Sequence, residues 1–146
     1  MIKLEFNGWK IEVDIAQTKS FYEKYHLITE DCSCHYCANY LLACDTFSLN
    51  IMGLFQSLGI DPKKEGEVFQ HFQQEDGLHF YGGFYHIVGN ILERSIGEGQ
   101  VIDAIDGILF SFTEDCSLVP NKFPTPTIQM EFEMKIPWLL KEDYRK

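Results

Sequence analysis

The sequence predicts a single domain of the α+β class over residues 1–146, with an antiparallel sheet of about six strands built from hairpins and a helical hairpin packed on one face. Three observations lead to this prediction. Runs of alternating apolar and polar residues are bounded by Asn-Gly, Asp-Gly and proline-rich turns. Helix-length apolar patterns follow one another between residues 16 and 58. Strands and helices are therefore grouped along the chain, which is typical of α+β domains.

Residues 2–15 predict the first β-hairpin. Apolar and charged residues alternate on both sides of Asn7-Gly8, the dipeptide most typical of a two-residue hairpin turn. Closing the chain there gives matched pairs on both faces, namely Phe6 with Trp9, Leu4 with Ile11, Ile2 with Val13, Glu5 with Lys10 and Lys3 with Glu12. One register thus satisfies an apolar face and a charged face.

The next segments predict three helices, over residues 16–26, 34–44 and 46–58. Ser33 is the expected cap of the second helix, and Asp45 or Thr46 that of the third. The run Leu58-Gly-Ile-Asp-Pro62 predicts the end of the third helix, with Gly59 in the left-handed position and a proline shortly after it. The short link between the last two helices predicts an antiparallel pair.

Strand patterns return from residue 67. Residues 67–74 and 78–81 flank Asp76-Gly77, and this turn places Gln74 opposite His79 and Phe72 opposite Tyr81. Gly82-Gly83 predicts a β-bulge before a strand over 84–92. Strands are also expected over 108–112 and 128–136, while 95–106 fits either a loop or a short helix.

Charge and composition narrow the classes of function. The net charge is −10, so a nucleic-acid backbone is repelled, and a basic protein is a candidate partner. The alternative is that this acidity only keeps the protein soluble. The longest apolar run is five residues, over 40–44, far short of the roughly 20 that a membrane span needs. We find no secretory signal, and we expect a cytoplasmic protein whose five cysteines are free or metal-bound.

Cys32, Cys34 and Cys37 form the only cluster with the density of a metal site. Three thiolates at the start of a helix could hold one Zn²⁺, with Cys116 as the preferred fourth ligand and His35 or His86 after it. Cys44 is excluded, because seven helical residues separate it from Cys37 by roughly 10 Å. Two alternatives stay open. The cysteines could pack as small apolar residues, or Cys34 and Cys37 could be a redox pair at a helix N-terminus.

The segment 78–86 concentrates polar rings around Gly82-Gly83. His79, Tyr81, Tyr85 and His86 are candidates for a pocket with hydrogen-bonding and acid–base groups. The alternative is aromatic packing on a bent strand.

Three motifs together resemble a family of uncharacterised small bacterial cytoplasmic proteins. These are the Cys-x-Cys-x-x-Cys-x-Asn run ending at Asn39, the Leu-Gly-Ile-Asp-Pro run, and Tyr-Gly-Gly-Phe-Tyr-His from Tyr81 to His86. The resemblance covers about residues 30–92 and implies no activity. It implies that the cysteine cluster and the Gly-Gly strand belong to one unit.

The leading functional hypothesis is a partner-binding or regulatory module of the inhibitor or immunity type, because an acidic surface suits a basic partner. A structural zinc domain using Cys32, Cys34 and Cys37 is the alternative. A thiol redox protein or a small-molecule enzyme is the second alternative. The sequence predicts no cofactor other than zinc, and it contains none of the common nucleotide, hydrolase or calcium-binding motifs.

Overall fold

The computed structural model describes residues 1–6, 9–25, 34–64, 67–73, 78–94, 103–105 and 107–141; of 67, 69–73 and 103–105 it describes the backbone alone. Three helices and seven strands lie within these ranges, and the strands form one sheet. The strands are β1 Ile2–Phe6, β2 Trp9–Val13, β3 Glu67–Gln73, β4 His79–Glu93, β5 Asp103–Ile105, β6 Ile108–Thr113 and β7 Thr127–Ile136. The helices are α1 Ile15–Lys24, α3 His35–Cys44 and α4 Leu49–Leu58. The α+β class and the antiparallel sheet are confirmed, with seven strands in place of about six.

The β1–β2 hairpin has the predicted register at all five pairs, from Phe6 opposite Trp9 to Ile2 opposite Val13. The turn residues 7 and 8 lie outside the described ranges. Trp9, Ile11 and Val13 are buried, and Lys3, Glu5 and Lys10 are exposed. Phe6 contacts the ring of Phe110 at 5.7 Å between centroids, although three strands separate β1 from β6 in the sheet order β1-β2-β4-β7-β6-β5. The sheet is therefore strongly curved, with the hairpin folded back over its inner face.

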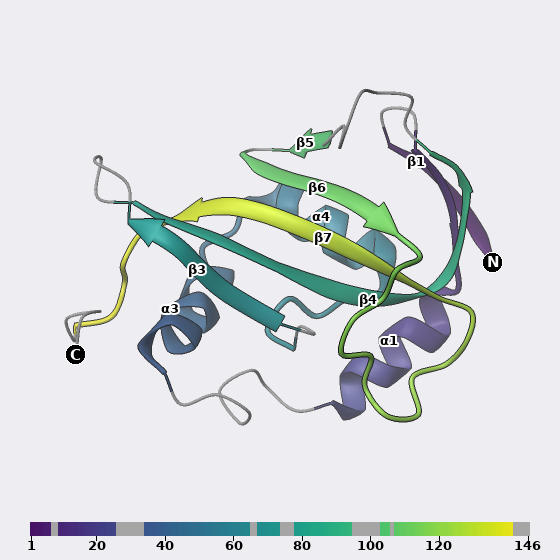
Figure 1. Cartoon of the computed structure of the whole chain (residues 1–146), viewed down its shortest axis with the longest axis horizontal. Helices are drawn as coiled ribbons and strands as arrows, with labels where there is room; N and C mark the ends of the chain where they lie inside the picture. Colours follow the sequence, from purple (N-terminus) through teal and green to yellow (C-terminus); the bar gives the residue numbers. More distant parts are fainter. Residues whose placement is uncertain are drawn as a thin grey trace.

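β4 is the central strand and runs the length of the molecule (Figure 1). One of its edges pairs with β7 from His79 to Val88. The other edge pairs first with β3, over residues 79–84, and then with β2, which meets Gly89 and the residues beyond it. Between these two partners, the edge of β4 at residues 86 and 88 has no neighbouring strand in the described part of the chain.

Helix α1 fills this gap with side chains. The hydroxyl of Tyr22 donates to the carbonyl of His86 at 2.7 Å and accepts from its N–H at 3.0 Å. The hydroxyl of Thr18 accepts from the N–H of Val88 at 3.0 Å, while the N–H of Asp14 donates to the Val88 carbonyl at 2.8 Å. Buried backbone groups must be paired, so these bonds fix α1 against the sheet. Asp14 caps the start of the helix, because its carboxylate accepts a hydrogen bond from the N–H of Gln17 at 3.0 Å.

Helices α3 and α4 cover the inner face of the sheet. Tyr40 of α3 packs on Tyr81 and Phe132, and Phe55 of α4 packs edge-on against Tyr85 at 5.1 Å. All five of these rings are buried. The apolar core lies between these two helices, the curved sheet and the β1–β2 hairpin.

The predicted antiparallel helical hairpin is wrong in its geometry. The axes of α3 and α4 differ in direction by 99°, because α3 packs beside β3 while α4 turns away to pack against α1. The cap of α4 is Ser48, whose hydroxyl accepts from the N–H of Ile51 at 3.2 Å, rather than Asp45 or Thr46. Within the described ranges, no single helix has the length and apolar character to cross a membrane; only the bent α3–α4 pair passes that test when the two helices are taken together.

The predicted register of β3 and β4 is also wrong. His79 lies opposite Gln73, one residue away from the predicted partner Gln74. The pairing shifts by one more residue between Gln70 and Phe72, so that Tyr81 lies opposite Gln70. This irregularity belongs to β3, whereas Gly82 and Gly83 pair regularly on both edges of a continuous β4. The Asp76-Gly77 turn lies outside the described ranges. The strands predicted over 108–112 and 128–136 are confirmed as β6 and β7, and part of 95–106 is the short strand β5.

At Gly89, β4 leaves no room for a side chain beside β2. A Cβ atom there would lie 2.1 Å from the carbonyl oxygen of Glu12, which belongs to the backbone and has no room to move. We expect Gly89→Ala to destabilise the fold by about 3 kcal/mol or more. Gly53→Ala on α4 is the control: no atom lies within 4 Å of its Cβ, and alanine favours a helix by about 1 kcal/mol. Urea unfolding should move the two midpoints in opposite directions, and an unchanged midpoint for Gly89→Ala would contradict the proposed contact.

Candidate functional site

Cys34 and Cys37 lie together at the start of α3. The Cys34 thiol caps the helix by accepting from the N–H of Cys37, with sulfur and nitrogen 3.4 Å apart. The two sulfurs are 3.3 Å apart. Cys34 is exposed and Cys37 is buried, and neither forms a disulfide. The structure therefore places one accessible thiol directly against a protected one.

The structure does not bring Cys116 to this pair. The Cys116 thiol donates to the carbonyl of Thr127, at the first residue of β7. Helix α3 meets the opposite end of that strand, where Asn39 donates to the carbonyl of Pro137 at 3.1 Å. Ten residues of extended chain separate these points by roughly 30 Å. Burial, followed by the nearby carboxylates of Asp115 and Glu114, also raises the pKa of the Cys116 thiol.

The remaining predicted ligands are only partly placed. Cys32 lies outside the described ranges, as does the predicted Ser33 cap. Cys44 is at the far end of α3, where its thiol donates to the carbonyl of Pro62, so its separation from Cys37 is confirmed. Among the described residues, no three His, Cys, Asp or Glu side chains gather closely enough to hold a metal ion.

Asn39, two residues beyond Cys37, is fully buried and ties the chain after β7 to α3. Its amide nitrogen donates to the carbonyl of Pro137, and its oxygen accepts from the N–H groups of Leu139 at 2.6 Å and Leu140 at 3.3 Å. These bonds hold Trp138 in contact with Tyr36, with the ring centroids 5.9 Å apart. An aromatic pair therefore lies at the first turn of α3, the turn that also carries Cys37.

Two of the four predicted pocket residues, Tyr81 and Tyr85, are buried anchors. The hydroxyl of Tyr81 donates to the carbonyl of Tyr36 at 3.0 Å and accepts from the amide of Asn39 at 3.4 Å; burial raises its pKa. The hydroxyl of Tyr85 contacts that of Tyr40 and donates to the carbonyl of Pro62 at 2.8 Å. These contacts join the Tyr-Gly-Gly-Phe-Tyr-His run to α3 and to the loop that follows α4.

The other two predicted pocket residues, His79 and His86, lie on opposite faces of β4. His79 packs against the ring of Trp138, with centroids 5.0 Å apart. His86 has its Nε2 atom 2.9 Å from the carbonyl of Ser117, while its Nδ1 atom has no partner among the described residues. Both side chains are 1% exposed. The four predicted residues are therefore buried, and they lie on both faces of β4.

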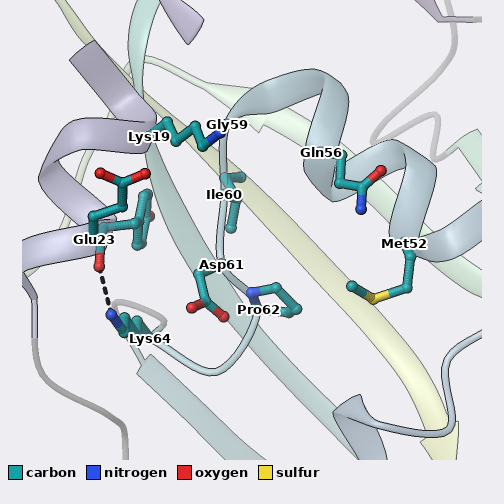
Figure 2. Close-up of a pocket in the computed structure, with 10 residues that line it drawn as sticks. Lys19, Glu23, Met52, Gln56, Gly59, Ile60, Asp61, Pro62 and Lys64 are labelled. Carbon is teal, nitrogen blue, oxygen red and sulfur yellow. Dashed lines mark hydrogen bonds between the residues drawn. The ribbon is translucent and has the colours of Figure 1, made fainter. Parts of the chain in front are cut away.

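The structure has a cavity elsewhere, which sequence reasoning missed. It lies between α1, the end of α4 and the loop 59–64, and its volume is about 660 Å³. Figure 2 shows Lys19 and Glu23 of α1 on one side, with Asp61 and Lys64 of the loop below. In the sequence, the Leu-Gly-Ile-Asp-Pro run predicts only a helix end, and Lys19 and Glu23 look like an ordinary solvated helix surface. We call this space the α1–α4 cavity.

Removing the Asn39 amide should release the C-terminal chain. Asn39→Ala leaves two N–H groups and a carbonyl without their partner, so we expect a loss of about 3 kcal/mol in the free energy of unfolding. Amide hydrogen exchange at Leu139 and Leu140 should accelerate strongly. Asn50→Ala, an exposed change on α4, is the control and should stay within about 0.5 kcal/mol of wild type. Unaltered exchange in Asn39→Ala would contradict the anchoring role.

Acid should destabilise the fold through His86. The Ser117 carbonyl can only accept, so Nε2 carries the proton, and protonation would add a second N–H at the buried Nδ1 atom. Burial lowers the pKa of His86 in the folded protein below the ordinary histidine pKa of about 6.5. As the pH falls below about 6.5, the unfolded chain therefore binds more protons than the folded protein does. Burial also lowers the pKa of His79, and the two effects have the same sign.

The stability contributed by a neutral His86 is present above about pH 6.5 and is lost as the pH falls below it. We expect the urea midpoint to be lower at pH 5.5 than at pH 7.5. The difference should shrink in His86→Gln, which keeps a donor for Ser117, and persist in the control His35→Gln. Equal midpoints for the wild type at the two pH values would show that burial of His86 has no such consequence.

Comparison with known proteins identifies no relative of this chain. No protein-family model, curated protein or solved structure matches the chain. The resemblance drawn from the three motifs stays a prediction.

Proposed function

We propose that this protein exchanges thiols and disulfides at the pair Cys34 and Cys37. The observation that supports this function best is the 3.3 Å separation of the two sulfurs, with one thiol exposed and the other buried. Dithiol proteins need an accessible thiol to meet the substrate and a protected one to complete the exchange. A pair of buried packing cysteines would need no such difference in exposure.

The proposed reaction proceeds in two steps. The Cys34 thiolate attacks one sulfur of a substrate disulfide, releases the other sulfur as a thiolate and forms a mixed disulfide. The Cys37 thiolate then attacks the sulfur of Cys34 and releases the second substrate thiolate. The pair ends as an intramolecular disulfide, and the substrate has gained two electrons and two protons.

Local geometry supports both steps. The N–H of Cys37 already donates to the Cys34 sulfur, and a charged thiolate is a stronger acceptor than a thiol. Closing the pair from 3.3 Å to the disulfide length of about 2.05 Å needs a movement of about 1.2 Å. Side-chain rotation within the first turn of α3 supplies a movement of that size.

The zinc alternative is less well supported. Bonds of about 2.3 Å in a tetrahedral zinc site hold two sulfurs roughly 3.8 Å apart, which is wider than the 3.3 Å found here. Such a site also needs two more ligands, and Cys116 lies at the other end of β7. Cys32 is the nearest further candidate in the sequence.

The partner-binding hypothesis is compatible with exchange chemistry. With a net charge of −10, the protein attracts basic chains, so a substrate that carries both a disulfide and positive charge is the expected partner. The reducing cytoplasm remains the expected compartment, because a dithiol that reduces substrates must itself be reduced again.

Exchange with glutathione tests the proposal directly. Reduced, zinc-free protein is equilibrated in buffers of reduced and oxidised glutathione, quenched with an alkylating agent and mapped by peptide mass. We expect a disulfide joining Cys34 to Cys37 to form as the buffer becomes more oxidising. Cys37→Ser should accumulate a glutathione mixed disulfide on Cys34, and Cys34→Ser should form no disulfide at Cys37.

Two further variants act as controls. Cys116→Ser should behave as the wild type, and so should Cys32→Ser if the pair alone carries the reaction. Thiols that stay reduced in oxidised glutathione would contradict the proposal. One zinc ion per chain that protects Cys32, Cys34 and Cys37 from alkylation would support the structural zinc alternative.

A further inference from the structure

We propose that the α1–α4 cavity binds a short apolar peptide with free termini, at a site separate from the two thiols. Its volume of about 660 Å³ lies within the range of roughly 300–1,000 Å³ typical of ligand pockets. It combines a buried apolar floor with charged side chains of both signs at its rim. Each of these features points to the same class of ligand.

The floor is apolar and held rigidly. Tyr22 and Ile60 are 3% and 5% exposed, and Pro62 is buried beside them. Tyr22 cannot turn away, because its hydroxyl is bonded to both backbone groups of His86. The carbonyl of Pro62 accepts from the hydroxyl of Tyr85 and from the thiol of Cys44, which hold the loop from below. A pre-formed floor reduces the entropy lost on binding.

Four charged groups surround this floor. Lys19 and Glu23 extend from α1, and Asp61 and Lys64 come from the loop (Figure 2). No ion pair joins any of these four to another described residue; Lys64 donates instead to the carbonyl of Tyr22 at 2.8 Å. By contrast, the neighbouring Lys63 points away and pairs with Asp45 at 2.7 Å. The loop thus directs one lysine outward and leaves charges of both signs at the cavity.

The charged side chains around the cavity favour a ligand that carries both a positive and a negative group. An anion alone would be opposed by Glu23, Asp61 and the net charge of −10. A ligand with only a positive charge would use Glu23 and Asp61 but would make no use of the ammonium of Lys19. A ligand with both charges places its ammonium near Glu23 and Asp61, where the C-terminal end of α1 also favours positive charge, and its carboxylate near Lys19.

The size of the cavity favours a peptide over a free amino acid. At about 30 Å³ for each water molecule, the cavity corresponds to roughly 20 waters. That space exceeds one amino acid and suits two or three residues. Met52 and Gln56 of α4 form the wall opposite α1, so an apolar side chain would lie over Tyr22, Ile60 and Pro62 with Met52 beside it.

Titration with charge-blocked dipeptides tests this inference. The probes are leucylphenylalanine with free termini, its N-acetyl form and its C-terminal amide, followed by calorimetry and by amide chemical shifts. We expect the free peptide to bind and each blocked form to bind at least about tenfold more weakly, because each loses one charged hydrogen bond. The shifts should centre on α1 and the loop 59–64.

Matched variants assign each charge. In Lys19→Gln, amidation of the peptide should no longer weaken binding. In Glu23→Gln, acetylation should weaken binding less than it does in the wild type, because Asp61 remains near the ammonium. Gln56→Trp should block the cavity and abolish binding, whereas Lys3→Gln on the exposed face of β1 should bind as the wild type. Cys34→Ser should also bind normally, since the site needs no thiol.

Three results would overturn the proposal. They are equal binding of free and blocked peptides, unchanged binding in Gln56→Trp, and no binding of any probe to protein whose circular dichroism is native. Failure of glutathione exchange leaves these measurements unaffected, so the two proposals stand or fall separately.

Discussion

The pairing of one edge of β4 is the constraint on which the rest of the structure depends. β4 has fifteen residues. Along the edge that does not pair with β7, it meets β3, then side chains of α1, then β2. Without Thr18 and Tyr22, the N–H groups of Val88 and His86 would be buried without partners, each at a cost of about 1–3 kcal/mol. Two hydroxyls therefore replace a strand. This substitution fixes α1 beside the sheet, and the position of α1 in turn creates one wall of the α1–α4 cavity.

Tyrosine hydroxyls on the face of β4 that the helices cover connect this strand to both candidate sites. Tyr81 bonds to the first turn of α3, next to Cys37, and Tyr85 bonds to the loop that floors the cavity. Helix α3 spans the same distance, with the two thiols at its start and Cys44 at its end, against Pro62. The tyrosines are buried, so each hydroxyl has a fixed partner and cannot exchange it for water. Both sites therefore rest on rigid supports, which proximity-dependent chemistry and selective binding require.

Sequence patterns predicted the parts of the fold that are set by neighbours along the chain. The β1–β2 register followed from one turn dipeptide and two matching faces, because a one-residue slip would reverse both faces at once. The β3–β4 register did not follow, because the pair of Gln73 with His79 is already one residue away from the one that a tight Asp-Gly turn implies. The irregularity between Gln70 and Phe72 then shifts the pairing once more, without a local signal in the sequence. The angle between α3 and α4 was missed for a related reason. A four-residue link permits either an antiparallel or a perpendicular pair, and distant contacts with β3 and α1 decide between them.

In the candidate sites too, contacts between residues close together in the sequence were predictable, and contacts between distant residues were not. Cys34 and Cys37 are three residues apart at a helix start, so their contact was predictable from spacing alone. Cys116 was chosen for the softness of its thiolate, but a ligand must first be within reach, and β7 separates the two ends of the sheet. The α1–α4 cavity carried no signal at all, because Lys19 and Glu23 meet Asp61 and Lys64 only after α1 docks on β4. A charged residue on a helix acquires a role in binding from what the fold places opposite it. For this chain, the bonds from Tyr22 to His86 make that placement.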